Sequence, residues 1–401
     1  MDRRNFLKFG AASSAAFFLS PYAKLYSASQ YKDKKLFLII LRGGLDGLSM
    51  VVPYGDNDYQ KMRGQYAIKK PRDENGALNL DGYFGLHPKL GNLKEMYDKK
   101  ELIIFNAVAT PYRNRSHFAA QEVLENGGDK PGLNDGWINR LILNQDNSSA
   151  LSLTKETPFI LSGESKNVSS YYPQQISQSK RDLTHKISQL YLQDEKLSKP
   201  VEQFIDIDKI AAIPIAGEDV KAYKNSPPAS ELERLIYSAS QIMKQNNNFN
   251  IAVFNVGGWD THRNQGVVNG VLANRMQNLA KGLSKIKTYM AKDWKDCCFL
   301  CVTEFGRTVQ FNGTNGTDHG SASVALLGGG AVKGGKILGD WPLLNRNRLY
   351  QKRDLLPTTD MRKIFKSTLR DHLKVDYKII EDKVFPGSMK IRYFNHLFKS
   401  R

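Results

Sequence analysis

The sequence predicts an α/β fold, built as a doubly wound and mainly parallel sheet with helices on both faces. Two observations lead to this prediction. Short apolar runs bounded by glycines recur along the 401 residues, and their length is typical of strands buried on both faces. Between several of these runs, apolar residues repeat with helical spacing. Strands that alternate with helices indicate a parallel sheet covered by helices.

Six apolar runs are the expected strands: LFLIIL (36–41), LIIFNAVA (102–109), PFILS (158–162), NIAVFNV (250–256), CCFLCV (297–302) and SVALLGG (323–329). The clearest helix is expected between the fourth and fifth runs, where apolar residues from Val271 to Met290 keep near-helical spacing. Further helices are expected from about 231 to 245 and from about 174 to 192. The polar stretch 163–228 fits the alternation less well, and we interpret it as a helical insertion within a single domain of residues 30–401.

The first 29 residues differ in kind from the rest. Paired Arg3 and Arg4 lie in the segment RRNFLK, which is followed by an apolar run of small residues. This pattern resembles a twin-arginine export signal, so residues 1–29 are expected to be a signal peptide recognised by the twin-arginine translocase. A bacterial protein in the periplasm or secreted from the cell is therefore expected. No later run approaches the roughly 20 apolar residues of a membrane span.

The composition is basic, with a formal net charge of +18. This charge favours an anionic small molecule or an acidic polysaccharide as partner, and a merely solvated basic surface is the alternative interpretation. Dispersed lysines without a readable recognition module argue against nucleic acid. Cys297, Cys298 and Cys301 share one apolar run, so we interpret them as core residues and not as a disulfide framework or a metal site.

Polar side chains of the kinds that bind metals stand next to five of the expected strands. They are Asp46 after the first, Ser116 and His117 after the second, Asp260 and His262 after the fourth, Glu304 and Arg307 after the fifth, and Asp318 and His319 before the sixth. Ligands of open parallel sheets bind beyond the carboxyl ends of the strands, so these groups are expected to converge. Carboxylates and imidazoles in one crevice repel or stay protonated unless a cation holds them. The sequence therefore predicts a divalent metal, with zinc as a candidate.

Six segments together resemble the alkaline phosphatase and sulfatase superfamily: RGGLDGL, RSHF, GGWDTH, TEFGR, DHG and GGGAVKGG. Within that superfamily they resemble an uncharacterised bacterial family that is often exported by the twin-arginine route. The resemblance covers about residues 35–375. It implies an alkaline-phosphatase-like sheet with a two-metal site at the strand ends and an esterase-like or phosphatase-like ancestry, without a known substrate.

The expected metal ligands are Asp46, Asp260, His262, Glu304, Asp318 and His319. Several depart from the superfamily pattern: Asp46 lies a few residues beyond the strand end, Asn264 stands where a histidine is usual, and Glu304 with Phe305 replaces an aspartate and histidine pair. Only His319 fits its place well, and Asp318 has a turn-forming role as its alternative. The resemblance therefore implies one or two ions.

Ser116, His117 and Arg307 are the expected catalytic residues. Ala109 occupies the reactive position of the segment ATPYR, which argues against a formylglycine sulfatase. Ser116 is expected to begin a helix, where free backbone N–H groups stabilise an anion, or else to serve only as its N-cap. His117 is expected near the reacting groups, with a loop hydrogen bond as the alternative. Arg307 would bind a phosphate or sulfate group bidentately, or else pair with Glu304.

The leading hypothesis is an exported metal-dependent hydrolase of phosphate or sulfate esters. A metal ion would lower the pKa of the Ser116 hydroxyl or of a bound water and offset the negative charge that develops. The alternative hypothesis is a non-catalytic exported binding protein with a degenerate metal site. The departures from the superfamily pattern favour the binding protein, whereas the joint presence of RSH, WDTH and DHG favours the enzyme.

Overall fold

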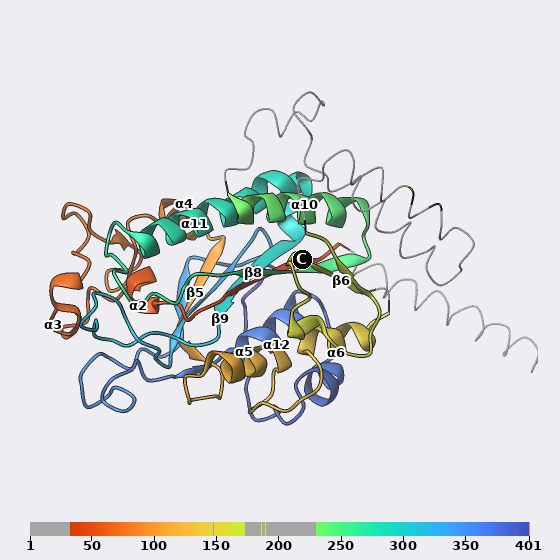
Figure 1. The fold of residues 1–401 in the computed structure, drawn as a ribbon. Coiled ribbons are helices and arrows are strands. Elements are labelled where there is room, and N and C mark those ends of the chain that lie inside the picture. The colour runs from red at the N-terminus through yellow and green to blue at the C-terminus, as the bar shows by residue number, and fades with distance from the viewer. Residues whose placement is uncertain (1–32, 147, 173–185, 187–188, 190–229, 401) are drawn as a thin grey trace, which may run out of the picture.

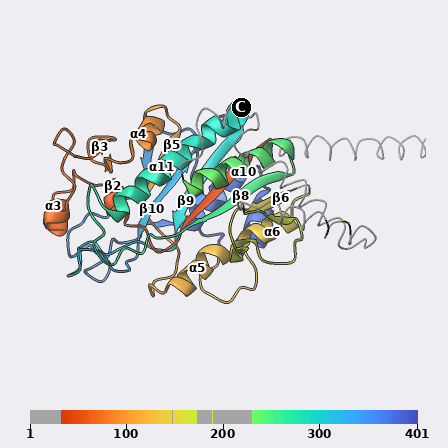
Figure 2. The same cartoon turned by 45° about the horizontal axis from the view of Figure 1, so that its top comes forward.

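The computed structural model describes residues 33–400 apart from 147, 173–185, 187–188 and 190–229 (Figure 1). The expected signal peptide, nearly all of the helix expected at 174–192 and most of the expected insertion at 163–228 lie outside the described residues. Elsewhere the chain forms one large sheet with helices on both of its faces (Figures 1 and 2).

The large sheet has nine strands among the described residues, with one path of eight and a ninth strand, β12, paired with β5. In spatial order the path runs β11 (Lys336–Leu338), β5 (Leu102–Ala109), β10 (Ser323–Gly328), β9 (Cys297–Thr303), β1 (Lys35–Leu41), β8 (Phe249–Val256), β6 (Ser149–Ser152) and β7 (Val168–Ser170), and β12 is Thr359–Asp360. Strand β10 is antiparallel to both of its neighbours, while the other pairs are parallel. The predicted α/β, mainly parallel sheet is thus confirmed.

Strand β1 lies between β8 and β9, and its whole sequence is buried. Alternate side chains of a strand point to opposite faces. Phe37 and Ile39 accordingly pack in the apolar cluster that contains α4 (Gly91–Asp98), α10 (Glu231–Gln245) and α11 (Val271–Met290). Leu36 and Leu38 pack in the cluster that contains α5 (His117–Asn126), α6 (Trp137–Leu143) and α12 (Met361–Asp371). The apolar runs are continuous because both faces of the sheet are covered.

Smaller elements complete the described chain. They are α2 (Gly47–Met50), α3 (Tyr59–Arg63), the short sheet of β2 (Val51–Val52), β4 (Gly85–Leu86) and β3 (Leu78–Asn79), the 3₁₀ turns Gly64–Tyr66, Phe159–Leu161 and Ala291–Asp296, and the π-helical turn Ile379–Val384. Within the described ranges, no helix is both long and apolar enough to cross a bilayer. The three cysteines are buried in β9 as free thiols, which confirms their interpretation as core residues.

The strand expected at 158–162 is wrong, because Phe159–Leu161 forms a 3₁₀ turn. In that turn the amide of Ile160 donates to the Glu125 carboxylate at 2.9 Å, and the amide of Leu161 donates to the carbonyl of Pro158. These backbone groups are therefore not available to a sheet. The missed strand β6 takes its place beside β8, and its short sequence SALS lacks a long apolar run.

Candidate metal centre

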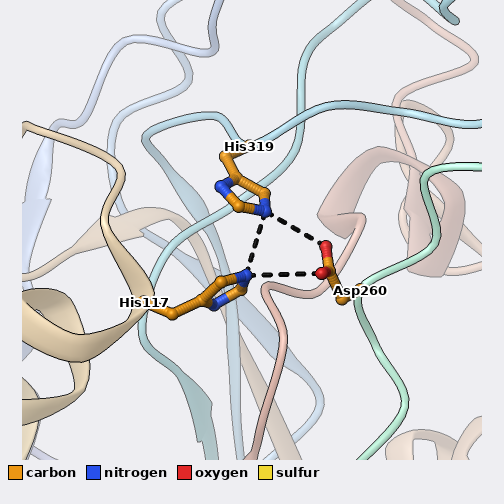
Figure 3. A group of neighbouring side chains, drawn as sticks. All are labelled: His117, Asp260 and His319. Atoms are coloured by element: carbon orange, nitrogen blue, oxygen red, sulfur yellow. Dashed lines mark hydrogen bonds and ion pairs between the residues drawn. The ribbon is translucent and has the colours of Figure 1, made fainter.

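Three side chains from distant parts of the sequence converge beyond the carboxyl ends of the central parallel strands (Figure 3). His117 begins α5, Asp260 follows β8, and His319 precedes β10. The Nε2 atoms of His117 and His319 are 2.9 Å apart, and the Asp260 carboxylate lies 3.1 Å from His319 Nε2 and 3.4 Å from His117 Nε2. Each residue thus offers one possible ligand atom to a common point.

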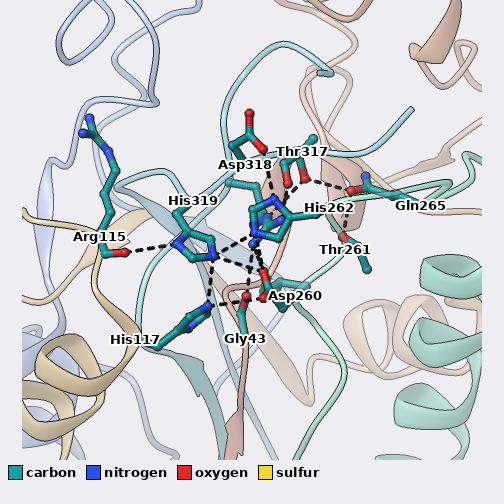
Figure 4. Close-up of polar contacts among 12 residues, drawn as sticks. Gly43, Arg115, His117, Asp260, Thr261, His262, Gln265, Thr317, Asp318 and His319 are labelled. Atoms are coloured by element: carbon teal, nitrogen blue, oxygen red, sulfur yellow. Dashed lines mark hydrogen bonds and ion pairs between the residues drawn. The ribbon is translucent and has the colours of Figure 1, made fainter. Parts of the chain in front are cut away.

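His262 stands beside this group (Figure 4). Its Nε2 lies 3.0 Å from His319 Nε2 and 3.0 Å from Asp260 Oδ1. Three imidazoles and one carboxylate therefore turn their ligand atoms toward one another. Solvent reaches this part of the surface, since the four side chains are between 25% and 41% exposed.

The second nitrogen of each imidazole faces a hydrogen-bond acceptor. Nδ1 of His117 lies 3.0 Å from Glu304 Oε1, Nδ1 of His262 lies 3.0 Å from Asp318 Oδ1, and Nδ1 of His319 lies 3.1 Å from the carbonyl oxygen of Arg115. Carbonyls and ionised carboxylates only accept, so each Nδ1 carries the hydrogen. In the neutral rings each Nε2 is therefore left with a lone pair, and these lone pairs meet at the common point.

The carboxyl groups of Glu304 and Asp318 are ionised at neutral pH, because the pKa of each lies below its usual value. Burial alone would raise the pKa of Glu304, but hydrogen bonds from His117, Gln121 and the backbone hold it below its usual value. A hydrogen bond from Asn312, aided by His262, likewise lowers the pKa of Asp318. Both groups therefore remain acceptors for the imidazoles.

The residues present fit a divalent cation such as zinc. Lone pairs that face one another at about 3 Å repel unless a cation or a proton lies between them. Tetrahedral zinc with bonds of about 2.0–2.1 Å to nitrogen places its ligand atoms about 3.3–3.4 Å apart. The contacts of 2.9, 3.1 and 3.4 Å around His117, Asp260 and His319 are close to that spacing. Hydrogen-bonded acceptors behind the imidazoles are also the usual second layer of metal sites.

Glycine at position 43 allows the chain to pack tightly under this group. Gly43 follows β1 with a φ of 119°, and a Cβ atom there would lie 2.5 Å from the Asp260 amide nitrogen. Its own amide donates to Glu304 Oε1 at 2.8 Å, and its carbonyl accepts from Arg307. The first glycine after the strand thus lets the segment that carries Asp260 lie directly against it.

The structure places Arg307 differently from the substrate-binding role expected of it. Its side chain is fully buried and donates to Asp260 Oδ1 at 2.6 Å, to the carbonyl of Gly43 and to Thr317. Because these groups occupy the guanidinium, it holds Asp260 in place and is not presented to a ligand. It pairs with Asp260 and not with Glu304, the partner considered from the sequence. Although burial would raise the pKa of Asp260, Arg307 holds it below its usual value.

Asp46 also differs from the metal ligand expected from the sequence. Both of its carboxylate oxygens are bound by the guanidinium of Arg63 at 2.6 and 2.7 Å, and Ser49 and Gln265 donate to the same group. The ion pair is fully buried. Asp46 therefore caps and anchors α2, and its oxygens have no capacity left for an ion at the histidine group.

Two further expected ligands lie behind the imidazoles. Glu304 contacts Nδ1 of His117, and Asp318 contacts Nδ1 of His262. Among the described residues, His117, Asp260 and His319 form the group of ligand-type side chains that could hold one ion. His117 was expected to be a catalytic residue and not a ligand. The geometry thus supports one centre, where one or two ions were expected.

Ser116 occupies the N-cap position of α5, immediately before His117. Its side chain is exposed and makes no capping hydrogen bond. The position agrees with a helix start, and the catalytic role stays a prediction.

Sequence reasoning missed Arg63 and the carbonyl of Arg115. Arg115 has a φ of 58°, which turns its carbonyl oxygen toward His319, and its guanidinium is anchored by the buried carboxylate of Asp354 at 2.7 Å. A non-glycine residue with positive φ leaves no signal in the sequence. Arg63 lies in an amphipathic stretch that gives no sign of its burial.

The fold and this site define an α/β protein with a candidate metal centre beyond the strand ends of a mainly parallel sheet. The chain belongs to the family described as "Protein of unknown function (DUF1501)", which matches residues 99–384. A search among curated proteins gives no match.

Solved structures with similarity to this chain include alkaline-phosphatase-like proteins. The alkaline phosphatase from the Antarctic bacterium TAB5 shares 10% identity over 76% of this chain and 94% of that chain, with a TM-score of 0.33. The phosphonate monoester hydrolase of Agrobacterium radiobacter shares 10% identity over 86% and 74%, with a TM-score of 0.32. The C-terminal periplasmic domain of EcEptC from Escherichia coli, in complex with Zn, shares 11% identity over 74% and 72%, with a TM-score of 0.31.

Proposed function

We propose that this protein is a metal-dependent hydrolase of phosphate or sulfate esters. One divalent ion such as zinc would be held by His117, Asp260 and His319, which leaves a fourth position for solvent, with His262 beside it. The observation that carries the proposal is the convergence of three imidazole Nε2 atoms and a carboxylate, with every Nδ1 held by an acceptor. These lone pairs repel one another unless a cation or a proton lies among them, and one bound cation satisfies all of them at once.

The exposure of the site favours catalysis over a purely structural metal. Structural zinc sites are closed, whereas catalytic sites keep a position open for water or substrate. The four side chains of this site are open to solvent, and two imidazoles with one carboxylate are a ligand set that hydrolytic zinc sites use. When bound, the ion would supply Lewis acidity toward an ester oxygen and a nucleophile at neutral pH.

Residues of the chain have distinct roles in this proposal. Glu304 orients His117, and Arg307 holds Asp260 while offsetting its charge. Ser116 places an exposed hydroxyl at the start of α5, next to a ligand, so it is the proposed nucleophile. The free backbone N–H groups of that first helical turn favour an anion there. A net charge of +18 supports an anionic substrate, including an acidic polysaccharide.

Export belongs to the same proposal. The segment RRNFLK near the N-terminus supports a twin-arginine signal and a place in the bacterial periplasm or outside the cell. That pathway carries folded proteins, so a metal centre assembled before export is compatible with it.

Metal content and turnover, measured on the same preparations, test the proposed function. Full-length protein is purified with zinc, its metal is quantified by mass spectrometry, and hydrolysis of p-nitrophenyl phosphate and p-nitrophenyl sulfate is followed. His319→Ala is expected to lose both metal and activity, because removing one imidazole weakens the whole ligand set. His396→Ala, which removes an exposed histidine from the C-terminal segment, is the matched control and should keep both.

Ser116→Ala separates nucleophile from ligand. It should lose hydrolysis and retain metal, because its hydroxyl is needed for attack and not for binding the ion. Retained activity together with a loss of stability of about 1 kcal/mol would instead make Ser116 a helix cap. Fully metal-loaded wild-type protein that turns over no ester of a broad panel would contradict the enzyme and support the non-catalytic binding protein.

A further inference from the structure

A cavity of about 190 Å³ lies beside the segment that leads from β8 to Asp260. Its walls come from the end of β8, which contributes Asn255, from Trp259, and from the neighbouring helices α10 and α11, which contribute Glu231 and Arg275. The two helices pack against each other, and Figure 1 shows them along one face of the sheet above β8. Asp260 directly follows Trp259, so one wall of the cavity is covalently adjacent to the candidate metal centre.

Arg275 enters this cavity without a carboxylate partner in the described part of the chain. Its guanidinium lies against the backbone of Gly258, where a Cβ atom would be 2.2 Å from it, and Gly258 has a φ of 90°. Its hydrogen bond is to the carbonyl of Gly257, at 3.3 Å. A guanidinium has five N–H donors, so most of them remain for a ligand. The second glycine of GGWDTH is thus required for this arginine to lie where it does.

The side chain of Trp259 forms part of the wall of the same cavity. Its side chain is 1% exposed, and its indole Nε1 has no hydrogen-bond partner among the described residues. Leaving a buried N–H group unpaired costs about 1–3 kcal/mol. The indole ring of Trp259 thus forms a wall of the cavity and can report on what the cavity holds.

The remaining polar groups of the cavity are also suited to an anion. The amide oxygen of Asn255 accepts from Arg42 at 3.0 Å, which leaves its NH₂ group as a donor. Glu231, the one carboxylate among the lining residues, accepts a hydrogen bond from the hydroxyl of Tyr172. Arg275 and Asn255 therefore supply the donors for a ligand, Arg275 also carries a positive charge, and Glu231 is the acidic group on the cavity wall.

We propose that this cavity is an oxyanion subsite, in which Arg275 and Asn255 bind a carboxylate, sulfate or phosphate group beside the Trp259 ring. A guanidinium beside neutral N–H donors matches the acceptor oxygens of such groups. Trp259 and Asp260 are consecutive residues, so one short segment carries both a wall of the cavity and a proposed metal ligand. The next step of this inference rests on the proposed function. The substrate of the hydrolase carries a second anionic group besides its scissile ester, as an acidic saccharide does.

Indole nuclear magnetic resonance tests the subsite independently of catalysis. The chain has four tryptophans, and Trp259→Phe identifies the indole signal of Trp259 in ¹⁵N-labelled full-length protein. Sodium sulfate and sodium glucuronate are titrated as oxyanion probes, and glucose is the neutral control. The Trp259 signal should shift saturably with sulfate and stay still with glucose. A matching shift with glucuronate shows that sugar carboxylates are accepted, whereas its absence restricts the ligand to tetrahedral sulfate or phosphate groups.

Variants decide whether the response comes from this cavity. Arg275→Ala should raise the dissociation constant for sulfate at least tenfold, and Arg275→Lys should raise it less. Arg346→Ala, which removes an exposed arginine elsewhere, should leave it unchanged. An unmoved Trp259 signal, or an Arg275→Ala constant within twofold of wild type, overturns the subsite. If Arg275→Ala does not fold, calorimetry of sulfate binding to Arg275→Lys replaces it, and a sulfate affinity equal to wild type overturns the subsite.

His319→Ala separates this inference from the proposed function. It removes a proposed metal ligand and leaves the cavity intact, so the sulfate response of Trp259 should persist in this variant. A response lost with His319→Ala would place the anion at the metal centre and overturn the subsite. Intact anion binding in a protein without esterase activity would instead contradict the proposed hydrolase.

Discussion

Glu304 supports the candidate centre through a single imidazole, and Glu304→Gln measures that support. Glu304 is buried, and its carboxylate accepts from Nδ1 of His117 at 3.0 Å, from the Gly43 amide at 2.8 Å and from Gln121 at 3.1 Å. Glutamine has the same shape and retains one acceptor oxygen. It lacks the negative charge that polarises the His117 ring and raises the basicity of its Nε2.

The expected loss follows from this contact. Removing the partner behind a metal-binding imidazole typically weakens metal affinity 10–100-fold, which corresponds to about 1.4–2.7 kcal/mol. We expect the upper part of this range because the pair is well shielded: the Glu304 side chain is 0% exposed and that of His117 is 26% exposed.

The assay is competition for zinc between the protein and a chromophoric chelator at pH 7.5. Glu95→Gln is the matched control, since Glu95 is an exposed carboxylate paired with Lys99 on α4, and its zinc affinity should equal that of wild type. Urea unfolding of the metal-free proteins checks that Glu304→Gln is folded. A folded Glu304→Gln protein whose zinc affinity lies within twofold of wild type would refute the role of Glu304 behind the metal ligand.

Two stability predictions concern groups outside the metal centre. Arg63→Met should lower the free energy of unfolding by about 3–5 kcal/mol, because it leaves the buried carboxylate of Asp46 unpaired. Lys94→Met, which breaks an exposed pair on α4, should cost at most about 0.5 kcal/mol in the same urea experiment; equal losses would contradict the burial argument. Burial lowers the pKa of His372 from 6.5 to about 3, so the unfolded chain takes up a proton below pH 6.5 that the folded protein does not. The stability that His372 contributes is therefore complete above pH 6.5 and falls by about 1.4 kcal/mol per pH unit down to about pH 3. Unfolding of wild type and His372→Gln between pH 7 and 4 checks this, and identical pH slopes would rule it out.

The sequence by itself determined the sheet and the order of the site segments along the chain. Continuous apolar runs predict strands covered on both faces, and β1, β5, β8, β9 and β10 all formed where such runs lie. The positions of His117 and Asp260 after strands were enough to predict that they meet, because carboxyl ends of parallel strands share one edge. His319 precedes β10 and reaches the same edge because β10 is antiparallel to both of its neighbours. Helix α10 also has the predicted bounds, Glu231–Gln245.

The tertiary structure alone decided which charged group faces which. Asp46 and Asp260 both follow strands and look alike in the sequence, yet Asp46 is neutralised by Arg63, while Asp260 is shared between Arg307 and the imidazoles. Glu304 lies behind a proposed ligand instead of being one. The physical reason is one of range. Apolar periodicity reports the burial of whole elements, whereas a ligand, an ion pair and an orienting acceptor differ by a few ångströms of side-chain position, which only long-range packing fixes.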